Sequence, residues 1–293
     1  MSSLLQSDLD RLLAFQAAAP RLLLLTGAGI SAGSGIPTYR DAEGTWLRAA
    51  PITHQEFLRD PARRRRYWGR SAVGWPGVRD ARPNAAHRAL ARLERAGAVA
   101  HLVTQNVDRL HQRAGSARVT DLHGRLDRVA CLHCGRHDDR EALQQRLLRD
   151  NPFLREGRGD ARPDGDAELP DADIARLRVP ACDSCGGVLM PDVVFFGGSI
   201  PAGRLTACRE ALAAADGLLV VGSSLQVYSG FRFCRDAAAA GKPIALLNPG
   251  RTRADDLAGL RLRSPAEDLL PALADALFHD AEKAHDTVKA ASA

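Results

Sequence analysis

Four of the six cysteines in this 293-residue chain stand in two Cys-x-x-Cys pairs, and this spacing suits a metal ion. The four residues are Cys131, Cys134, Cys182 and Cys185. Two such pairs can bring four thiolates around one zinc ion, and a glycine follows each pair where a tight turn needs a flexible backbone. Because four thiolates leave no open position for water, the sequence predicts a structural Zn²⁺. We expect the nearby His133 and His137 to be exposed loop residues rather than ligands.

A glycine-rich segment over residues 27–36 directly follows the apolar run 22–25, which is typical of a buried parallel strand. Glycines let a backbone approach a phosphate, and the N–H groups that begin a following helix attract negative charge. The spacing Gly-x-Gly-x-x-x-Gly misses the dinucleotide fingerprint by one residue, and residues 46–51 carry no Asp or Glu at the place a dehydrogenase needs one. By itself the segment is compatible with nucleotide binding or with a plain strand-to-helix turn, and it disfavours hydride transfer.

Short apolar runs alternate with helical patterns along the rest of the chain. The expected strands are 22–26, 100–104, 217–222 and 243–247. This alternation predicts an α/β fold with a doubly wound, Rossmann-like parallel sheet, whose ligands lie at the carboxyl ends of the strands. Thr26, Thr104 and Gly222 each end a strand, so the loops that follow them should face one crevice.

The arrangement of the motifs predicts a large and a small domain. We assign residues 1–38, 80–124 and 191–293 to the large Rossmann-like domain. The small domain is expected to consist of a helical module, 39–79, and a zinc-binding module, 125–190. Within the zinc module we expect a helix near 141–149 and an irregular stretch from 155 to 173.

Composition limits the classes of function. The chain is 45% hydrophobic, has a formal net charge of +5, and contains no run of 18 apolar residues that could span a membrane. Only 5% of its residues are aromatic, which argues against a nucleic-acid interface built on base stacking. Asp8 and Asp10 argue against a secretory or mitochondrial leader. We expect a cytoplasmic, most simply bacterial, monomer without a nucleic-acid or membrane partner.

Several blocks stand in a characteristic order. The first, residues 27–40, reads Gly-Ala-Gly-Ile-Ser-Ala-Gly-Ser-Gly-Ile-Pro-Thr-Tyr-Arg. It is followed by Thr-Gln-Asn-Val-Asp from 104, Leu-His-Gly from 122, Gly-Ser-Ser-Leu-Gln-Val from 222 and Leu-Asn at 247. These blocks resemble the signatures of the sirtuins, the NAD-dependent protein deacylases, over nearly the whole chain. The resemblance implies that NAD and an acylated lysine of a protein or peptide meet in the cleft between the two domains.

The resemblance also implies roles for individual residues. His123 matches the family's catalytic base, and a histidine suits this task because its unperturbed pKa lies near neutrality. Asn106 would order the catalytic water and bind the nicotinamide ribose. Asp108, with the backbone of Ile36, would hold the carboxamide, although its position also suits a helix cap. His111 is expected to be a packed, hydrogen-bonded residue. The implied NAD-binding residues are Gly27, Ala28, Gly29, Ser31, Ile36, Pro37, Tyr39, Arg40, Trp46, Gln105, Asn106, Asp108, His123, Gly222, Ser223, Ser224, Asn248, Pro249, Gly250 and Ala266.

The substrate-binding segments depart from the family pattern. The residues implied to contact the acylated peptide are Val194, Phe195, Phe196, Gln226 and Val227. Gly198 stands where most sirtuins carry glutamate, and Gly230 follows Tyr228-Ser229 where many carry proline. Both departures fall on segments that clamp a peptide by backbone pairing, and they cast doubt on efficient general deacetylation.

Tyr67 and Arg70 lie three residues apart, on one face if the segment is helical. Sirtuins that remove succinyl, malonyl or glutaryl groups use a Tyr-x-x-Arg pair to bind the distal carboxylate, and the wider segment is most like mitochondrial sirtuin 4 and its bacterial relatives. Arg70 can equally be one more arginine on a basic helix. The sequence thus favours a class II deacylase acting on longer or carboxylate-bearing acyl groups. Protein mono-ADP-ribosyl transfer and a non-catalytic NAD-sensing, zinc-dependent scaffold remain as alternatives.

Overall fold

The computed structural model describes residues 2–38, 51–155, 167 and 169–291, and these residues contain a six-stranded parallel sheet. The strand order is β3-β2-β1-β7-β8-β9, and every neighbouring pair is parallel. The strands are β1 (Leu22–Thr26), β2 (Val99–Thr104), β3 (Val119–Asp121), β7 (Gly217–Val221), β8 (Ile244–Leu247) and β9 (Leu260–Leu262). The carboxyl ends of β1, β2, β7 and β8 therefore meet at one edge, as the sequence predicts.

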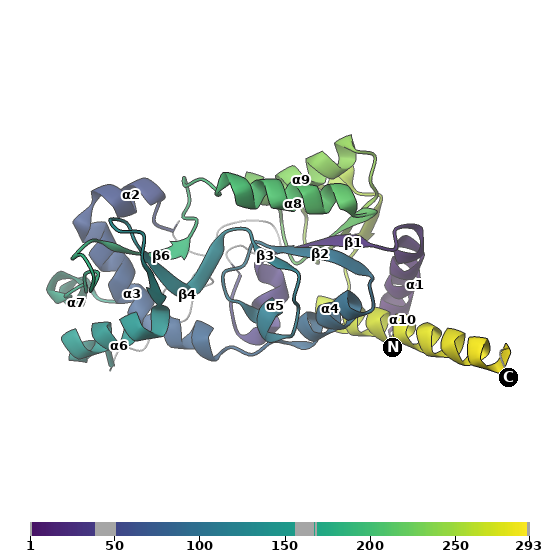
Figure 1. Cartoon of the computed structure of the whole chain (residues 1–293), viewed down its shortest axis with the longest axis horizontal. Coiled ribbons are helices and arrows are strands. Elements are labelled where there is room, and N and C mark those ends of the chain that lie inside the picture. The colour runs from purple at the N-terminus through teal and green to yellow at the C-terminus, as the bar shows by residue number, and fades with distance from the viewer. Residues whose placement is uncertain (1, 39–50, 156–166, 168, 292–293) are drawn as a thin grey trace.

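Both faces of this sheet are covered by helices, which explains why the central strands are continuously apolar. In β1, Leu22 and Leu24 belong to one hydrophobic core, whereas Leu23 and Leu25 belong to the other. The first core is completed by α1 (Ser3–Ala18), α4 (Ala85–Arg95) and α10 (Ala266–Ala291), and the second by α8 (Ala202–Ala214) and α9 (Tyr228–Ala239). Figure 1 shows α8 and α9 on one side of the sheet and the other group on the opposite side.

The small domain combines helices with a three-stranded antiparallel sheet of order β5-β4-β6. Its elements are α2 (His54–Arg59), α3 (Pro61–Asp80), β4 (Gly124–Cys131), β5 (His137–Asp139), α6 (Arg140–Asp150), η2 (Pro152–Arg155), α7 (Asp171–Arg176) and β6 (Leu189–Val193). Phe57 and Trp68 of the helical module share one hydrophobic core with Val129 and Leu147 of the zinc module. The two insertions therefore form a single packed unit. The remaining described elements are η1 (Ala28–Ser34), α5 (Leu110–Arg113) and η3 (Asp255–Leu257).

The four strands expected from apolar runs are present within a residue or two. The helix expected at 141–149 is α6, and its N-cap is Asp139, whose carboxylate accepts the N–H of Glu141 at 2.8 Å. Most of the stretch expected to be irregular lies outside the described residues, but α7 falls at its end. β6 crosses the expected boundary at 191, because its residues pair with β4 of the small sheet. Among the described residues, no helix is both long and apolar enough to cross a bilayer.

Gly124 begins β4 where the chain passes into the small domain, and its φ of 85° lies in the left-handed region. A Cβ there would clash with the carbonyl oxygen of Asp192 and come 2.9 Å from the Cα of Val193. We predict that Gly124→Ala lowers the free energy of unfolding by more than about 3 kcal/mol, because backbone strain and a clash with backbone atoms add. Denaturant titration measures this loss.

Gly97→Ala is the matched control. Gly97 has a φ of 82°, but a Cβ there would meet nothing within 4 Å. Its variant should lose only the strain of about 1–2 kcal/mol. Equal losses in the two variants would show that the close approach of β4 to β6 does not require glycine.

Candidate active site

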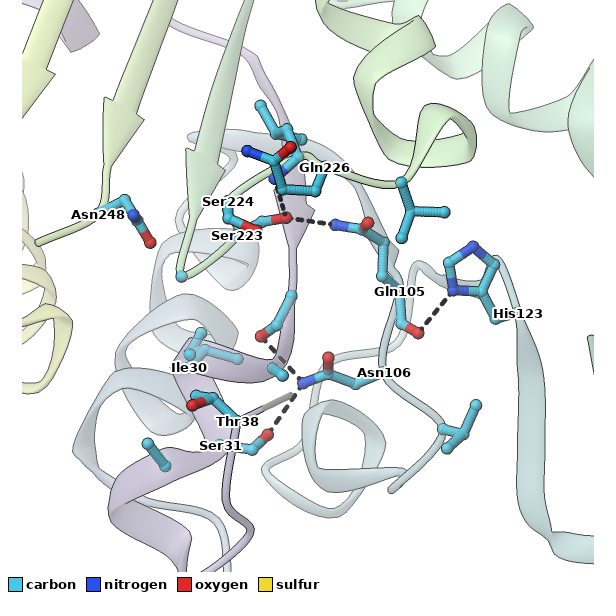
Figure 2. Close-up of a pocket in the computed structure, with 18 of the residues that line it drawn as sticks. Ile30, Ser31, Thr38, Gln105, Asn106, His123, Ser223, Ser224, Gln226 and Asn248 are labelled. Atoms are coloured by element: carbon cyan, nitrogen blue, oxygen red, sulfur yellow. Dashed lines mark hydrogen bonds between the residues drawn. The ribbon is translucent and has the colours of Figure 1, made fainter. Parts of the chain in front are cut away.

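A cavity of about 770 Å³ lies at the carboxyl edge of the parallel sheet, where it is also bounded by residues of the small domain. The loops after β1, β2, β7 and β8 all contribute polar residues to its lining. Figure 2 shows Ser31, Asn106, Ser223 and Asn248 around this space, with His123 at one end. A volume of this size falls in the range of cavities that enclose small molecules and cofactors.

The glycine-rich loop after β1 packs directly on the loop after β7. The N–H of Gly29 donates to the carbonyl oxygen of Gly222 at 2.8 Å. A Cβ on Gly29 would lie 2.8 Å from that oxygen, and one on Gly27 would lie 2.7 Å from the Cβ of Ser223. Glycine is therefore needed at both positions because the two loops pack closely. The sequence suggests a different reason for these glycines, the approach of a phosphate. Most of this glycine-rich loop forms the 3₁₀ helix η1, whose N-cap is Gly27.

Ser31 is the centre of a buried hydrogen-bond network below the cavity. Its hydroxyl donates to the Asp108 carboxylate at 2.7 Å and accepts from Nδ2 of Asn106 at 3.0 Å. Asn106 Nδ2 also donates to the carbonyl oxygen of Gly27 at 3.1 Å (Figure 2). The other Asp108 oxygen accepts the N–H of Leu110 at 2.9 Å, so Asp108 caps the chain entering α5 while it lines the cavity. Burial raises the pKa of Asp108.

Two buried histidines, His87 and His111, pack beside this network. The rings of His87 and His111 lie 4.8 Å apart, and His111 Nε2 is 2.9 Å from the hydroxyl of Thr26. Burial lowers the pKa of His87 to about 4 and the pKa of His111 well below its ordinary value, so both rings are neutral near pH 7. His111 is a packed, hydrogen-bonded residue, as expected from the sequence.

His123 stands at the wall of the cavity between β3 and β4. Its Nδ1 lies 3.0 Å from the carbonyl oxygen of Gln105 (Figure 2), and its Nε2 lies 2.8 Å from the hydroxyl of Ser229. The Gln105 side chain donates to Ser223 Oγ at 2.9 Å, which ties His123 to the loop after β7. Loss of hydration lowers the pKa of His123 to about 4, so the ring is neutral and can accept a proton near pH 7.

The small domain contributes the apolar end of the cavity. Tyr67 of α3 and Phe195, just after β6, both line it, and their rings meet edge to face with centroids 5.2 Å apart. Phe57 stacks on Phe195 at 5.1 Å, and the N–H of His54 donates to the carbonyl oxygen of Phe196 at 2.8 Å. The segment after β6 is thus held against α2 and α3. Val194 and Phe196, which the sequence implied, line the cavity from the same segment, whereas Gln226 and Val227 line it from the loop after β7.

Arg70 lies one turn from Tyr67 on α3 but does not appear in the cavity wall formed by the described residues. Its Nε donates to the carbonyl oxygen of Ala167 at 2.8 Å. Tyr67 therefore lines the cavity, whereas Arg70 is hydrogen-bonded to residue 167.

The four paired cysteines come together in the small domain. Their sulfur atoms all lie within 4.8 Å of one another, with Cys131 and Cys182 buried and Cys134 and Cys185 exposed. Gly135 and Gly186 have φ values of 72° and 70°, so both turns use the left-handed backbone that glycine favours. A Cβ on Gly187 would come 2.9 Å from the Cys131 sulfur. The donor set and the space match a tetrahedral zinc site. His133 and His137 are exposed, as expected.

Comparison with known proteins agrees with this geometry. The model of the Sir2 family matches residues 27–229, more than half of the chain. The chain belongs to the Sir2 family. It is 52% identical over 264 residues to the NAD-dependent protein deacetylase of Bordetella bronchiseptica, covering 90% of this chain and 96% of that protein.

Solved structures of Sir2 proteins share the fold. A Sir2 homologue in complex with NAD superposes with a TM-score of 0.71 at 33% identity, covering 92% of this chain and 94% of the other. A Sir2 protein with a p53 peptide and NAD⁺ superposes with a TM-score of 0.72 at 28% identity, covering 94% and 98%.

Within this Sir2 fold, the cavity gathers most of the cofactor-binding residues that the sequence implied. Tyr39, Arg40 and Trp46 lie outside the described residues, and Pro37 is exposed beside the cavity rather than in its wall. The other implied residues line it; they are Gly27, Ala28, Gly29, Ser31, Ile36, Gln105, Asn106, Asp108, His123, Gly222, Ser223, Ser224, Asn248, Pro249, Gly250 and Ala266.

Sequence reasoning missed several residues of this Sir2 cavity. Ser229 and Arg232 line it from the N-terminal part of α9, and Leu126 and Val193 line it from β4 and β6. For Ser229 a signal existed, because it lies in a segment that departs from the family pattern. Nothing in the sequence marked the other three as cavity residues.

The neutral histidines predict acid sensitivity of this Sir2 protein. Because the pKa values of His87 and His123 fall from about 6.5 in the unfolded chain to about 4, the unfolded state binds more protons in this window. Their contribution to stability is complete above pH 6.5 and is lost as the pH falls toward 4. The free energy of unfolding should fall by up to about 1.4 kcal/mol per pH unit for each histidine.

Denaturant titrations from pH 7 to pH 5 measure this slope. His87→Gln should reduce it, whereas the matched change His137→Gln at an exposed histidine should leave it unchanged. An identical slope in all three proteins would mean that His87 does not contribute to the acid sensitivity.

Proposed function

We propose that the protein is an NAD-dependent protein-lysine deacylase that releases nicotinamide and O-acyl-ADP-ribose. The observation that carries this proposal is His123, a neutral imidazole whose Nε2 is an acceptor at the wall of a cavity shared by the two domains. The membership in the Sir2 family and the deacetylase relative of B. bronchiseptica support the same reaction. We further propose NAD and one structural Zn²⁺ as cofactors, and a monomeric, cytoplasmic enzyme.

The residues present fit NAD. When bound, NAD would supply the bond between ribose and nicotinamide that breaks and a ribose hydroxyl that gives up a proton. Asn106 is fixed by Ser31 and Gly27 through its Nδ2, and its Oδ1, which has no partner among the described residues, is left to accept from a sugar hydroxyl or water. His123 can take up a proton at Nε2 because Nδ1 is held by the carbonyl oxygen of Gln105.

We propose that the substrate is an acylated lysine of a protein or peptide and that acyl groups longer than acetyl are accepted. The wall on the small-domain side supports this, since Leu126, Val193 and Phe195 are apolar and Gly198 adds no side chain. The peptide bound by a Sir2 protein of the same fold supports the substrate class. A carboxylate-bearing acyl group is the less supported part of the proposal, because Arg70 donates to Ala167 and does not line the described cavity.

A panel of lysine peptides carrying acetyl, succinyl, glutaryl, methylglutaryl, lipoyl and long-chain acyl groups tests the function. Nicotinamide release and O-acyl-ADP-ribose formation are measured by mass spectrometry. His123→Ala should lower turnover by at least about 100-fold, the typical contribution of a general base, while NAD binding is retained. His137→Gln is the control and should keep full turnover. Deacylation that persists in His123→Ala would contradict the role of His123 as the base.

The same panel separates the alternative functions. An ADP-ribosylated protein or peptide with its acyl group intact would indicate mono-ADP-ribosyl transfer. NAD binding without any acyl-dependent nicotinamide release would indicate an NAD-sensing role. Activity confined to the acetyl peptide would contradict the proposed acceptance of longer groups.

The variant Arg70→Ala tests whether the Tyr-x-x-Arg pair binds the distal carboxylate of an acyl group. If Arg70 binds the distal carboxylate, the variant should lower kcat/KM for succinyl and glutaryl peptides at least about tenfold and leave uncharged acyl groups unchanged. Arg66→Ala is the matched control, because Arg66 lies on the same helix in an exposed pair with Asp171. An unchanged preference in Arg70→Ala would remove Arg70 from the substrate site.

A further inference from the structure

Ser229 lies next to the candidate base without having been assigned a role. It is the second residue of α9, it lines the cavity, and its hydroxyl oxygen lies 2.8 Å from Nε2 of His123. This contact joins the helix after the β7 loop to the histidine between β3 and β4. It is the shorter of the two hydrogen bonds that the described residues make to the ring.

The partners of the ring determine the direction of both hydrogen bonds. Nδ1 faces the carbonyl oxygen of Gln105 at 3.0 Å, and a carbonyl oxygen can only accept, so Nδ1 carries the proton in the neutral ring. Nε2 then has a lone pair and no proton, and the Ser229 hydroxyl must donate to it. The serine therefore holds the nitrogen that has to receive a proton in the form that can receive one.

The next residue, Gly230, lies against the side chain of Gln105, the residue whose backbone carbonyl bonds Nδ1 of His123. A Cβ on Gly230 would clash with the amide of Gln105, coming 2.8 Å from Cδ. That amide donates to Ser223 and to the carbonyl oxygen of Thr26, and the backbone carbonyl of Gln105 holds Nδ1. Ser229 thus contacts Nε2 directly, and Gly230 leaves space for the side chain of the residue whose backbone carbonyl bonds Nδ1. Gly230 is the position at which many sirtuins carry proline.

We propose that Ser229 is a positioning residue for His123, which holds Nε2 unprotonated and directed at the cavity until a substrate hydroxyl takes the place of the serine hydroxyl. Nε2 has one lone pair and accepts one donor at a time, so the two hydroxyls exchange rather than bind together. This inference rests on the proposed function for its catalytic consequence, but not for the hydrogen bond itself.

The other groups around the ring do not reproduce this effect. Gln105 bonds Nδ1 alone, and Arg204 of α8, whose field disfavours the imidazolium, donates to the carbonyl oxygen of Leu122. Among the described residues, the Ser229 hydroxyl is the donor at Nε2. Because it bonds the neutral form of the ring, its removal should favour protonation.

The experiment measures His123 directly by ¹⁵N NMR, with His123→Ala used to assign its signals. In Ser229→Ala, the Nε2 resonance at neutral pH should move toward that of an unbonded imidazole nitrogen, and the pKa of His123 should rise by about 0.7 unit, the equivalent of one ordinary hydrogen bond. Ser229→Thr keeps the hydroxyl and should keep both values. Asp236→Ala, on the exposed side of α9, is the control and should change neither.

The kinetic consequence is read in the same proteins. Ser229→Ala should lower kcat about 3- to 10-fold with KM for NAD unchanged, and should move the acid limb of kcat/KM to higher pH. Ser229→Thr should restore wild-type behaviour. An unchanged Nε2 resonance and pKa in Ser229→Ala would overturn the proposal, whether or not the protein is a deacylase. Altered resonances in a protein without deacylase activity would instead keep the positioning role and reject the proposed function.

Discussion

The close approach of two loops, after β1 and after β7, is the constraint on which the site depends. Gly29 donates to the carbonyl oxygen of Gly222, and neither position tolerates a Cβ. Hydrogen bonds connect these two loops to the candidate base. Ser223 Oγ accepts a hydrogen bond from the side-chain amide of Gln105, and the backbone carbonyl oxygen of Gln105 accepts one from Nδ1 of His123. A side chain that separated the loops would therefore displace the candidate base even though it touches neither ring nitrogen.

Of the polar side chains below the cavity, Ser31 and Asp108 are buried and Asn106 is half-buried, and hydrogen bonds link all three. Burying a polar group without a partner is costly, so Ser31, Asn106 and Asp108 bond one another and hold a single arrangement. Two non-glycine residues with left-handed backbone, Arg109 and Leu225, lie in the loops of this site. Such conformations persist where the surrounding structure determines them, and here the N–H of Leu225 is held by Ser223 Oγ at 3.2 Å.

The small domain contributes shape rather than charge. Because the helical module and the zinc module share one core, the four cysteines that order the knuckles also stabilise the wall formed by Tyr67 and Phe195. A change at the four cysteines would therefore reach this wall of the cavity through the shared core. The rings of Phe57, Tyr67 and Phe195 belong both to the core of the small domain and, for Tyr67 and Phe195, to the cavity wall.

Much of this architecture is determined by local sequence. The apolar runs define the central strands because both of their faces are buried, and each Cys-x-x-Cys pair places two thiolates within reach of one metal. The folded small domain brings the two pairs together. The motifs after Thr26, Thr104 and Gly222 meet because parallel strands end at one edge. β3 and β9 were not expected, since strands of three residues carry too few side chains to show a period.

Only the tertiary structure decided which side chains meet across long sequence separations. The sequence placed Tyr67 and Arg70 on one helix, but of the two only Tyr67 lines the described cavity, and Arg70 Nε donates to the carbonyl oxygen of Ala167. The sequence indicated that the glycines of the first loop matter, but it gave no sign that this loop packs against Gly222. The contact of Ser229 with His123 joins residues 106 positions apart, and no local pattern records it. Propensity and spacing act over a few residues, whereas these contacts depend on how helices and loops pack on the completed sheet.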